Sequence, residues 1–168
     1  MSRQEHLAEA PEGLGYALVT VSDTRTEADD LSGRRMKELV EGAGQRVVEK
    51  LIVRDEAAAI RGAVSALLST EEVDVVVVSG GTGVAPRDVT IEAVEPLLER
   101  GLPGFGEIFR ALSYRQVGAA AMLSRAAAGV ARGRAVFLLP GSPKAVELAM
   151  AELILPEAGH LVGQARRS

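Results

Sequence analysis

A polar, glycine-rich loop follows the most apolar run of this sequence, because SGGTGVAPRDVT (residues 79–90) comes directly after VDVVVV (residues 73–78). Consecutive glycines allow backbone N–H groups to approach an anion without interference from a Cβ atom, and a threonine hydroxyl adds a donor. The pattern favours a phosphate-binding loop, although a tight strand-to-helix connection that needs glycine only for its dihedral angles would look the same. The candidate binding residues are Ser79, Gly80, Gly81, Thr82 and Gly83.

Two aspartates are candidates to hold a metal ion beside this loop. Asp88 lies at the far end of the loop, and Asp55 follows another predicted strand, RVVEKLIV (residues 46–53). Each lies beside a predicted helix start, where a carboxylate is favoured by the helix dipole, so either could serve only as a cap. We expect the two to lie at adjacent strand ends. A pair of carboxylates next to a phosphate loop suits Mg²⁺ that bridges substrate phosphates.

The sequence LPGSPKA (residues 139–145) predicts a second anion site. A serine N-cap followed by proline is a favoured helix start, and the N–H groups of such a start attract anions, although simple capping is the alternative. A third polar loop begins where the first predicted strand ends, and its acidic side chains could also be plain solvated charges. The candidate binding residues of these two loops are Pro140, Gly141, Ser142, Pro143 and Lys144, and Ser22 and Asp23.

Several familiar sites are absent from the sequence. No glycine pair continues into the lysine of a Walker A loop, and the dinucleotide fingerprint fails because Pro86 stands at its third glycine position. The two histidines, His6 and His160, are far apart, which disfavours a metal pair or a catalytic triad. The chain has no cysteine, so disulfides, thiolate zinc sites and thiol nucleophiles are excluded together.

Strands and helices are predicted to alternate along the chain. The helix at residues 90–101 should begin with Thr90 as its N-cap and be kinked or shortened by Pro96, and the last helix should end at Pro156. Apolar patterning predicts strands at residues 15–22, 46–53, 73–79 and 134–140, helices at residues 31–40, 55–69, 90–101 and 142–155, and an Ala-rich segment, helical with breaks, at residues 103–132.

This alternation predicts an α/β fold of three α/β/α layers with a mostly parallel central sheet. Parallel sheets bind ligands outside the carboxyl ends of their strands, near a point where the strand order reverses. All four polar loops described above follow predicted strands. We therefore expect them to converge on one rim of the sheet and to form one shared site.

Composition sets the class of partner. The 168 residues suit a single domain at residues 15–168 after a flexible N-terminal extension at residues 1–14. A net charge of −4 and only 3% aromatic residues disfavour nucleic acid and anionic membranes as partners. The first residues lack the apolar core of a signal peptide, and no run approaches the length of a membrane span, so a cytoplasmic protein is expected.

With these residues in view, the sequence resembles the MoaB/MogA family of molybdenum-cofactor biosynthesis proteins and the G domain of gephyrin. The resemblance runs from about Gly15 to Val162, with its motifs in the family's order. The sequences EIFRALSY and LPGSPKA are more similar to the MoaB branch than to MogA. The motifs that carry it are SGGTGVAPRDVT, PGFGEIFRALSY, AAMLSRAAAG and LPGSPKAVELA.

The resemblance implies a chain that binds molybdopterin, assembles as a trimer or hexamer, and hands its product to a molybdenum-insertion protein. Asp55 and Asp88 match the family's essential acidic pair, which handles metal and catalysis. The glycine loop, the Ser142 loop and the loop beginning at Ser22 match its binding loops. Glu107, Ser124 and Arg125 also stand in family motifs and are expected at the binding site.

Three functions remain open at this stage. The leading prediction is transfer of AMP from Mg-ATP to the terminal phosphate of molybdopterin, with release of pyrophosphate. The first alternative is a non-catalytic protein on the same fold that binds molybdopterin or acts as a scaffold. The second is a nucleotide-processing hydrolase on a related fold.

Overall fold

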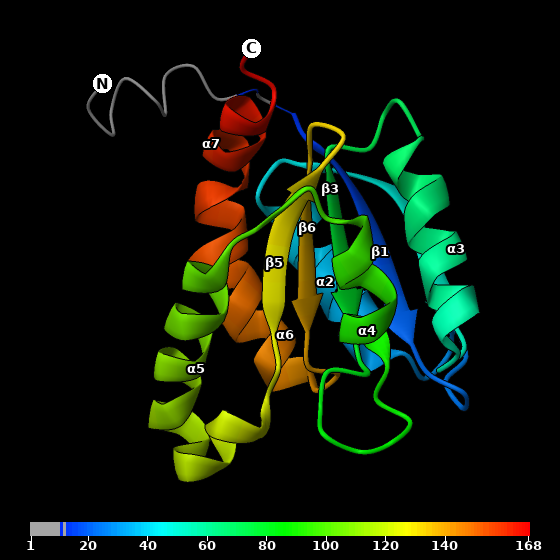
Figure 1. Ribbon diagram of the computed structural model, residues 1–168, viewed down its shortest axis with the longest axis vertical. Helices are drawn as coiled ribbons and strands as arrows, with labels where there is room; N and C mark the ends of the chain where they lie inside the picture. The colour runs from blue at the N-terminus through cyan, green and yellow to red at the C-terminus, as the bar shows by residue number, and fades with distance from the viewer. Residues whose placement is uncertain (1–10, 12) are drawn as a thin grey trace.

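The structure, a computed structural model, describes residues 11 and 13–168, and a six-stranded sheet lies at its centre (Figure 1). The strand order is β2-β1-β3-β6-β5-β4, and the first four strands of that order run parallel. The prediction of a mostly parallel sheet is therefore confirmed. The strands are β1 Gly15–Val21, β2 Arg46–Val53, β3 Val75–Ser79, β4 Arg100–Gly101, β5 Ala127–Ala131 and β6 Arg134–Leu139.

Helices cover both faces of the sheet, which gives the three layers that the alternation predicts (Figure 1). The aliphatic side chains of β1, β3 and β6 alternate between the two faces and supply two separate cores. The helices on one face are α2 Leu31–Gly42, α5 Pro103–Val117, α6 Pro143–Ala149 and α7 Leu155–Ala165, and those on the other are α3 Ala57–Leu68 and α4 Thr90–Val94.

The expected N-terminal extension lies mostly outside the described residues, which leave out residues 1–10 and 12. Its last residue, Leu14, is 3% exposed, belongs to the core and donates its N–H to Oε1 of Gln45 over 2.6 Å. Of the two histidines, His6 also lies outside the described part, and His160 contacts Glu157 in α7.

The far edge of the sheet differs from the prediction of broken helices over residues 103–132. Residues 127–131 form β5, which pairs antiparallel with β6. Arg132 and Gly133 both adopt positive φ angles, 51° and 72°, as a tight hairpin turn requires. The turn brings the alanine-rich strand onto β6, and this pairing outweighs the helical preference of alanine.

Proline acts in opposite ways in two helices. Pro96 ends α4 early, because a short 3₁₀ segment, Glu95–Leu97, follows α4 and leads into β4 where helix was expected up to residue 101. The prediction that the last helix ends at Pro156 was wrong. A π-helical segment, Met150–Ile154, precedes it, and helix α7 then continues through it. A wider turn at that point accommodates a residue that has no N–H to donate.

Of the two predicted N-caps, one is confirmed and the other is wrong. Ser142 caps α6, since its hydroxyl accepts the N–H of Ala145 over 3.2 Å and Pro143 follows at the first helical position. Thr90 is not the N-cap of α4, because Val89 occupies that position. The Thr90 hydroxyl instead donates to the carbonyl of Gly80 over 2.7 Å and ties α4 to the glycine loop.

Helix α3 offers a test of the fold at a position away from any site. Gly62 lies in the interior of α3 and is exposed, and a Cβ atom added there meets nothing within 4 Å. Alanine restricts the unfolded chain more than glycine does, so Gly62→Ala should raise the free energy of unfolding by about 0.5–1 kcal/mol. Urea denaturation measures the change, and a loss of stability would contradict the helix as described.

Candidate functional site

The four parallel strands end at one edge of the molecule, and the loops that follow them touch (Figure 1). The N–H of Asp55, after β2, donates to Oδ1 of Asp23, after β1, over 2.9 Å. The hydroxyl of Ser32, at the start of α2, donates to the carbonyl of Gly141, after β6, over 2.6 Å. Loops that are far apart in the sequence thus form the common rim that the alternation of elements predicts.

Glycine is required where the loops after β3 and β6 pass each other. Gly80 has a φ of +103°, and a Cβ atom there would stand 2.5 Å from the carbonyl oxygen of Val21. A Cβ atom on Gly141 would stand 3.3 Å from Cα of Gly80. The N–H of Gly80 donates to the carbonyl of Leu139 over 2.8 Å. At Gly80 the residue type therefore serves backbone packing, and its N–H is already committed within the protein.

A cavity of about 350 Å³ opens beside this crossing. It lies at the carboxyl ends of β1, β3 and β6, where the chain order reverses between β1 and β3. Five of the predicted binding residues line it: Ser22, Ser79, Gly141, Ser142 and Pro143. The polar residues that the sequence did not single out are Thr20, Arg25, Asp30 and Ser32.

Most polar groups in this cavity are satisfied by the protein itself. Asp30 is 1% exposed and accepts hydrogen bonds from the Thr20 hydroxyl over 2.8 Å, from the N–H of Gly33 and from Nζ of Lys50 over 3.2 Å. It therefore caps α2 and fixes the wall of the cavity. An aspartate directly before a stretch with helical apolar spacing is a typical N-cap, so the sequence alone could have identified Asp30 in this role.

The hydroxyl of Ser79 is the exception. Ser79 is fully buried and lines the cavity, yet its Oγ has no hydrogen-bond partner among the residues that the structure describes. A buried hydroxyl without a partner costs about 1–3 kcal/mol of stability. A polar ligand in the cavity would supply the missing hydrogen bond, so this oxygen makes the cavity a candidate binding site.

Replacing the Ser79 hydroxyl should separate stability from binding. Ser79→Ala removes an unsatisfied polar atom without changing the backbone, so the free protein should gain about 1 kcal/mol of stability. Thermal unfolding of both proteins measures the difference. If Ser79→Ala were clearly less stable than the wild type, the hydroxyl would have a partner and the cavity would lose its main mark as a site.

The acidic pair is arranged differently from the prediction. Strand β1 lies between β2 and β3, so Asp55 and Asp88 do not follow adjacent strands. Burial raises the pKa of Asp55, as do the neighbouring charges of Asp23 and, more weakly, Asp88, while Arg87 opposes this shift. Asp88 accepts the N–H of Ala85 at its Oδ2 over 3.0 Å. The charge of Asp88 thus acts on Asp55, although neither carboxylate lines the 350 Å³ cavity.

These carboxylates fit Mg²⁺ only together with a phosphate ligand. The negative charges of Asp23 and Asp88 disfavour the charged form of Asp55, and a divalent cation would relieve this. Within the described part of the chain, no group of three His, Cys, Asp or Glu side chains could hold a metal ion. Mg²⁺ typically takes one or two carboxylates and completes its shell with water and substrate phosphates, which agrees with a pair.

The raised pKa of Asp55 gives a pH-dependent expectation. The folded protein binds this proton more tightly than the unfolded chain does, so its contribution to stability grows as pH falls through the raised pKa and is lost as pH rises. Asp55→Asn should therefore match or exceed the wild type in melting temperature at pH 7, and the gap should close in acid. Glu56→Gln, at an exposed neighbouring position, is the control. A wild type that is more stable than Asp55→Asn at pH 7 would contradict the assignment.

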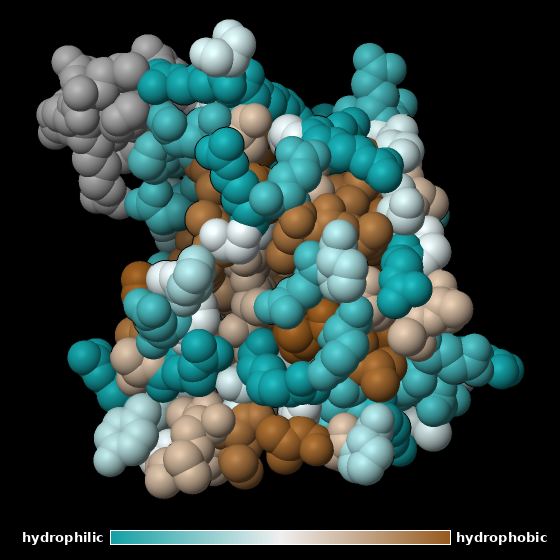
Figure 2. Space-filling view, in the orientation of Figure 1, coloured by the Kyte–Doolittle hydropathy of each residue, from teal (hydrophilic) through white to brown (hydrophobic). Residues whose placement is uncertain are grey.

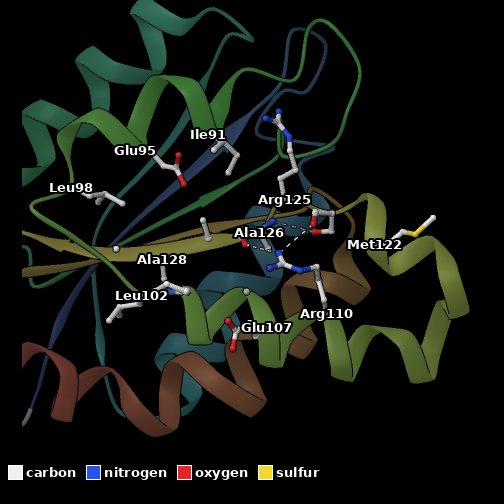
Figure 3. Close-up of a pocket in the computed structure, with 15 residues that line it drawn as sticks. Ile91, Glu95, Leu98, Leu102, Glu107, Arg110, Met122, Arg125, Ala126 and Ala128 are labelled. Atoms are coloured by element: carbon white, nitrogen blue, oxygen red, sulfur yellow. Dashed lines mark hydrogen bonds between the residues drawn. The ribbon is translucent and has the colours of Figure 1, made fainter.

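A second, larger hollow of about 720 Å³ lies between α4 and α5 over β5 (Figures 2 and 3). In Figure 2 its floor is pale and weakly apolar, and hydrophilic side chains surround it. Glu107, Ser124 and Arg125 line this hollow and not the cavity beside Ser79. Arg110, which the sequence did not single out, also lines it and donates to the carbonyls of Ser124 and Ala126.

The remaining predicted residues lie at the rim or beyond it. Thr82, within the glycine loop, is buried, and Pro140, at the start of the Ser142 loop, is half-buried. Lys144 is exposed and borders another hollow with Glu147 on the outer side of α6, away from the Ser79 cavity. None of the described helices is both long enough and apolar enough to cross a lipid bilayer.

Comparison with known proteins gives consistent matches over nearly the whole chain. The family model described as "Probable molybdopterin binding domain" matches residues 17–160. The molybdenum cofactor biosynthesis protein B of Bacillus subtilis (strain 168) is 51% identical over 168 residues, which cover 99% of each chain.

Solved structures agree with the sequence matches. A crystal structure of molybdenum cofactor biosynthesis protein B superposes with a TM-score of 0.91 at 49% identity, over 95% of this chain and 99% of that one. The tungsten cofactor synthesizing protein MoaB from Pyrococcus furiosus superposes with a TM-score of 0.81 at 39% identity, over 94% of this chain and all of that one.

Proposed function

The chain belongs to the molybdopterin-binding family of molybdenum cofactor biosynthesis proteins, in its MoaB branch, and from that premise we propose that it is a molybdopterin adenylyltransferase. The substrates are molybdopterin and Mg-ATP. An oxygen of the terminal phosphate of molybdopterin attacks the α-phosphorus of ATP. The bond from that phosphorus to the bridging oxygen breaks, and pyrophosphate leaves.

One observation carries this proposal. The loops at the carboxyl edge of the sheet carry a fully buried, unpartnered hydroxyl, Ser79, and two carboxylates, Asp55 and Asp88, of which Asp55 has a raised pKa. A phosphate needs hydrogen-bond donors, and its metal ion needs carboxylates. Adenylyl transfer brings two phosphate-bearing substrates together, so it uses both features of the rim at once.

The residues of this chain would act mainly by position and charge. Ser79 and the Ser142 loop hold polar groups of a bound substrate in the 350 Å³ cavity. Asp55 and Asp88 would hold Mg²⁺, which neutralises phosphate charge when it is bound. The chain has no cysteine, and the site contains no histidine among the described residues, so no side chain is proposed as a covalent nucleophile.

The proposal includes a homo-oligomer, a trimer or hexamer, in the cytoplasm. Apolar side chains that are more than half exposed gather on α5 and the 3₁₀ segment after it, Gly118–Leu123, and a second copy of the chain would cover them. Hand-off of the product to a molybdenum-insertion protein is part of the same proposal. The exposed residues are Ile108, Tyr114, Val117, Met122 and Leu123.

A transfer assay tests the function directly. Purified protein with molybdopterin and Mg-ATP should form adenylylated pterin and pyrophosphate. Asp88→Asn should lower the rate by about 100-fold or more, because it removes one charge of the metal pair. Glu56→Gln serves as the matched control, since it removes an exposed carboxylate next to Asp55, and it should leave the rate unchanged.

The same assay decides between catalysis and binding alone. The family description names pterin binding and no reaction, which favours a non-catalytic binding or scaffold role as the second candidate. In that case calorimetry would give pterin affinity that Mg²⁺ and ATP leave unchanged, and wild type would release no more pyrophosphate than Asp88→Asn.

A further inference from the structure

Both ends of the loop that carries Asp88 are held by one side chain. Nε of Arg125 donates to the carbonyl of Gly83 over 2.9 Å, and Nη2 donates to the carbonyl of Asp88 over 3.0 Å. The four residues between them, 84–87, are exposed to solvent. The guanidinium of Arg125 thus spans the base of a projecting loop. In Figure 3 its side chain extends away from Arg110, toward the loop that precedes α4.

The position of Arg125 is itself fixed from two sides. Its backbone N–H donates to the carbonyl of Thr82 over 2.9 Å, and it stands just before β5, which is part of the sheet. Its guanidinium also forms an ion pair with Glu92 in α4, which lowers the pKa of Glu92 and raises that of Arg125. The loop is therefore linked through one residue to β5 and to α4.

The bonds inside the loop do not attach it to the rest of the fold. The N–H of Asp88 donates to the carbonyl of Ala85 over 2.9 Å, and Oδ2 of Asp88 accepts the N–H of Ala85. These two bonds shape the turn and orient the carboxylate relative to it. Thr90 ties Gly80 and Gly81, just before the turn, to α4. At the two ends of the turn itself, Gly83 and Asp88, the guanidinium of Arg125 supplies the hydrogen bonds to the rest of the fold.

We propose that Arg125 is a positioning residue, which fixes residues 83–88 and with them the carboxylate of Asp88, and that it does not bind substrate. This role departs from the substrate contact that the sequence motif implies for Arg125. Its effect on catalysis rests on the proposed adenylyl transfer, whereas its effect on the loop does not. A lysine cannot replace it, because one ammonium group cannot hold two separated carbonyls and a carboxylate in a fixed fork.

The test compares Arg125→Gln with the wild type in two independent measurements. Hydrogen exchange of the Ala85 and Asp88 amides, which are the hydrogen-bonded N–H groups of the loop, should become at least about tenfold faster, since the base of the loop is released. The rate of adenylyl transfer should fall by about 10–100-fold, while the dissociation constants for molybdopterin and for ATP without Mg²⁺ stay within about twofold. Arg125→Lys should behave like Arg125→Gln.

Arg134→Gln is the matched control. Arg134 makes three similar guanidinium bonds to the carbonyls of Val73, Arg132 and Thr70, at the opposite end of the strands. Its loss should leave exchange in residues 83–88 and the transfer rate unchanged, even if it lowers the melting temperature. If Arg125→Gln does not fold, Glu92→Gln loosens the same guanidinium and should accelerate exchange in the loop.

The outcomes separate the two proposals. A wild type without transfer activity would overturn the proposed function, and the exchange measurement would still decide the role of Arg125. Unchanged exchange of the loop in Arg125→Gln would overturn the positioning role. A loss of affinity for either substrate larger than the loss in transfer rate would overturn it as well, because Arg125 would then be a substrate contact.

Discussion

The close crossing of two loops is the constraint on which this site depends. Gly80 and Gly141 stand in contact, and Gly80 lies against the carbonyl of Val21, so a side chain at Gly80 would collide with the end of β1. The N–H of Gly80 also donates to the carbonyl of Leu139, at the end of β6, over 2.8 Å. Ser79 is fully buried directly before this crossing and lines the cavity beside it. The two glycines therefore serve backbone packing, and the cavity forms beside the place where the loops pack.

Some residues at the rim stabilise its structure, and others have polar groups that a ligand could satisfy. Asp30 is fully hydrogen-bonded and fixes the start of α2, and Arg125 is bonded to the glycine loop and to Glu92. Ser79 has an unmet hydrogen bond, and Asp55 carries a charge that its surroundings disfavour. Unmet bonds and unfavourable charges are the features that a substrate and its metal ion would satisfy.

Much of the fold could be predicted from the sequence because the buried strands are strongly patterned. The run at residues 75–78 is continuously apolar, and the structure buries β3 on both faces as the third strand of the sheet. β5 was missed because alanine favours helix and the decisive signal lies in the turn of Arg132 and Gly133. Pro156 was misjudged because a π-helical turn, which depends on the packing of α6 and α7, carries no sequence signature.

The site was predictable to a smaller extent. The rim itself follows from strand direction, and Ser22, Ser79 and Ser142 do line one cavity. The sequence could not give the strand order, which puts β1 between the strands that precede Asp55 and Asp88. Nor could it separate the Ser79 cavity from the hollow that contains Glu107 and Ser124, because both sets of residues follow strand ends or turns.

The central claim is that Asp55, Asp88 and the Ser79 cavity form one site for a phosphate substrate and its metal ion. A crystal structure of the protein with Mg²⁺ and a non-hydrolysable ATP analogue tests it most directly. The account predicts a metal ion about 2.1 Å from an oxygen of Asp55 and of Asp88, with nucleotide phosphates completing its shell beside the rim. Nucleotide and metal bound elsewhere, for example in the hollow lined by Arg110, with both carboxylates uncoordinated, would contradict it.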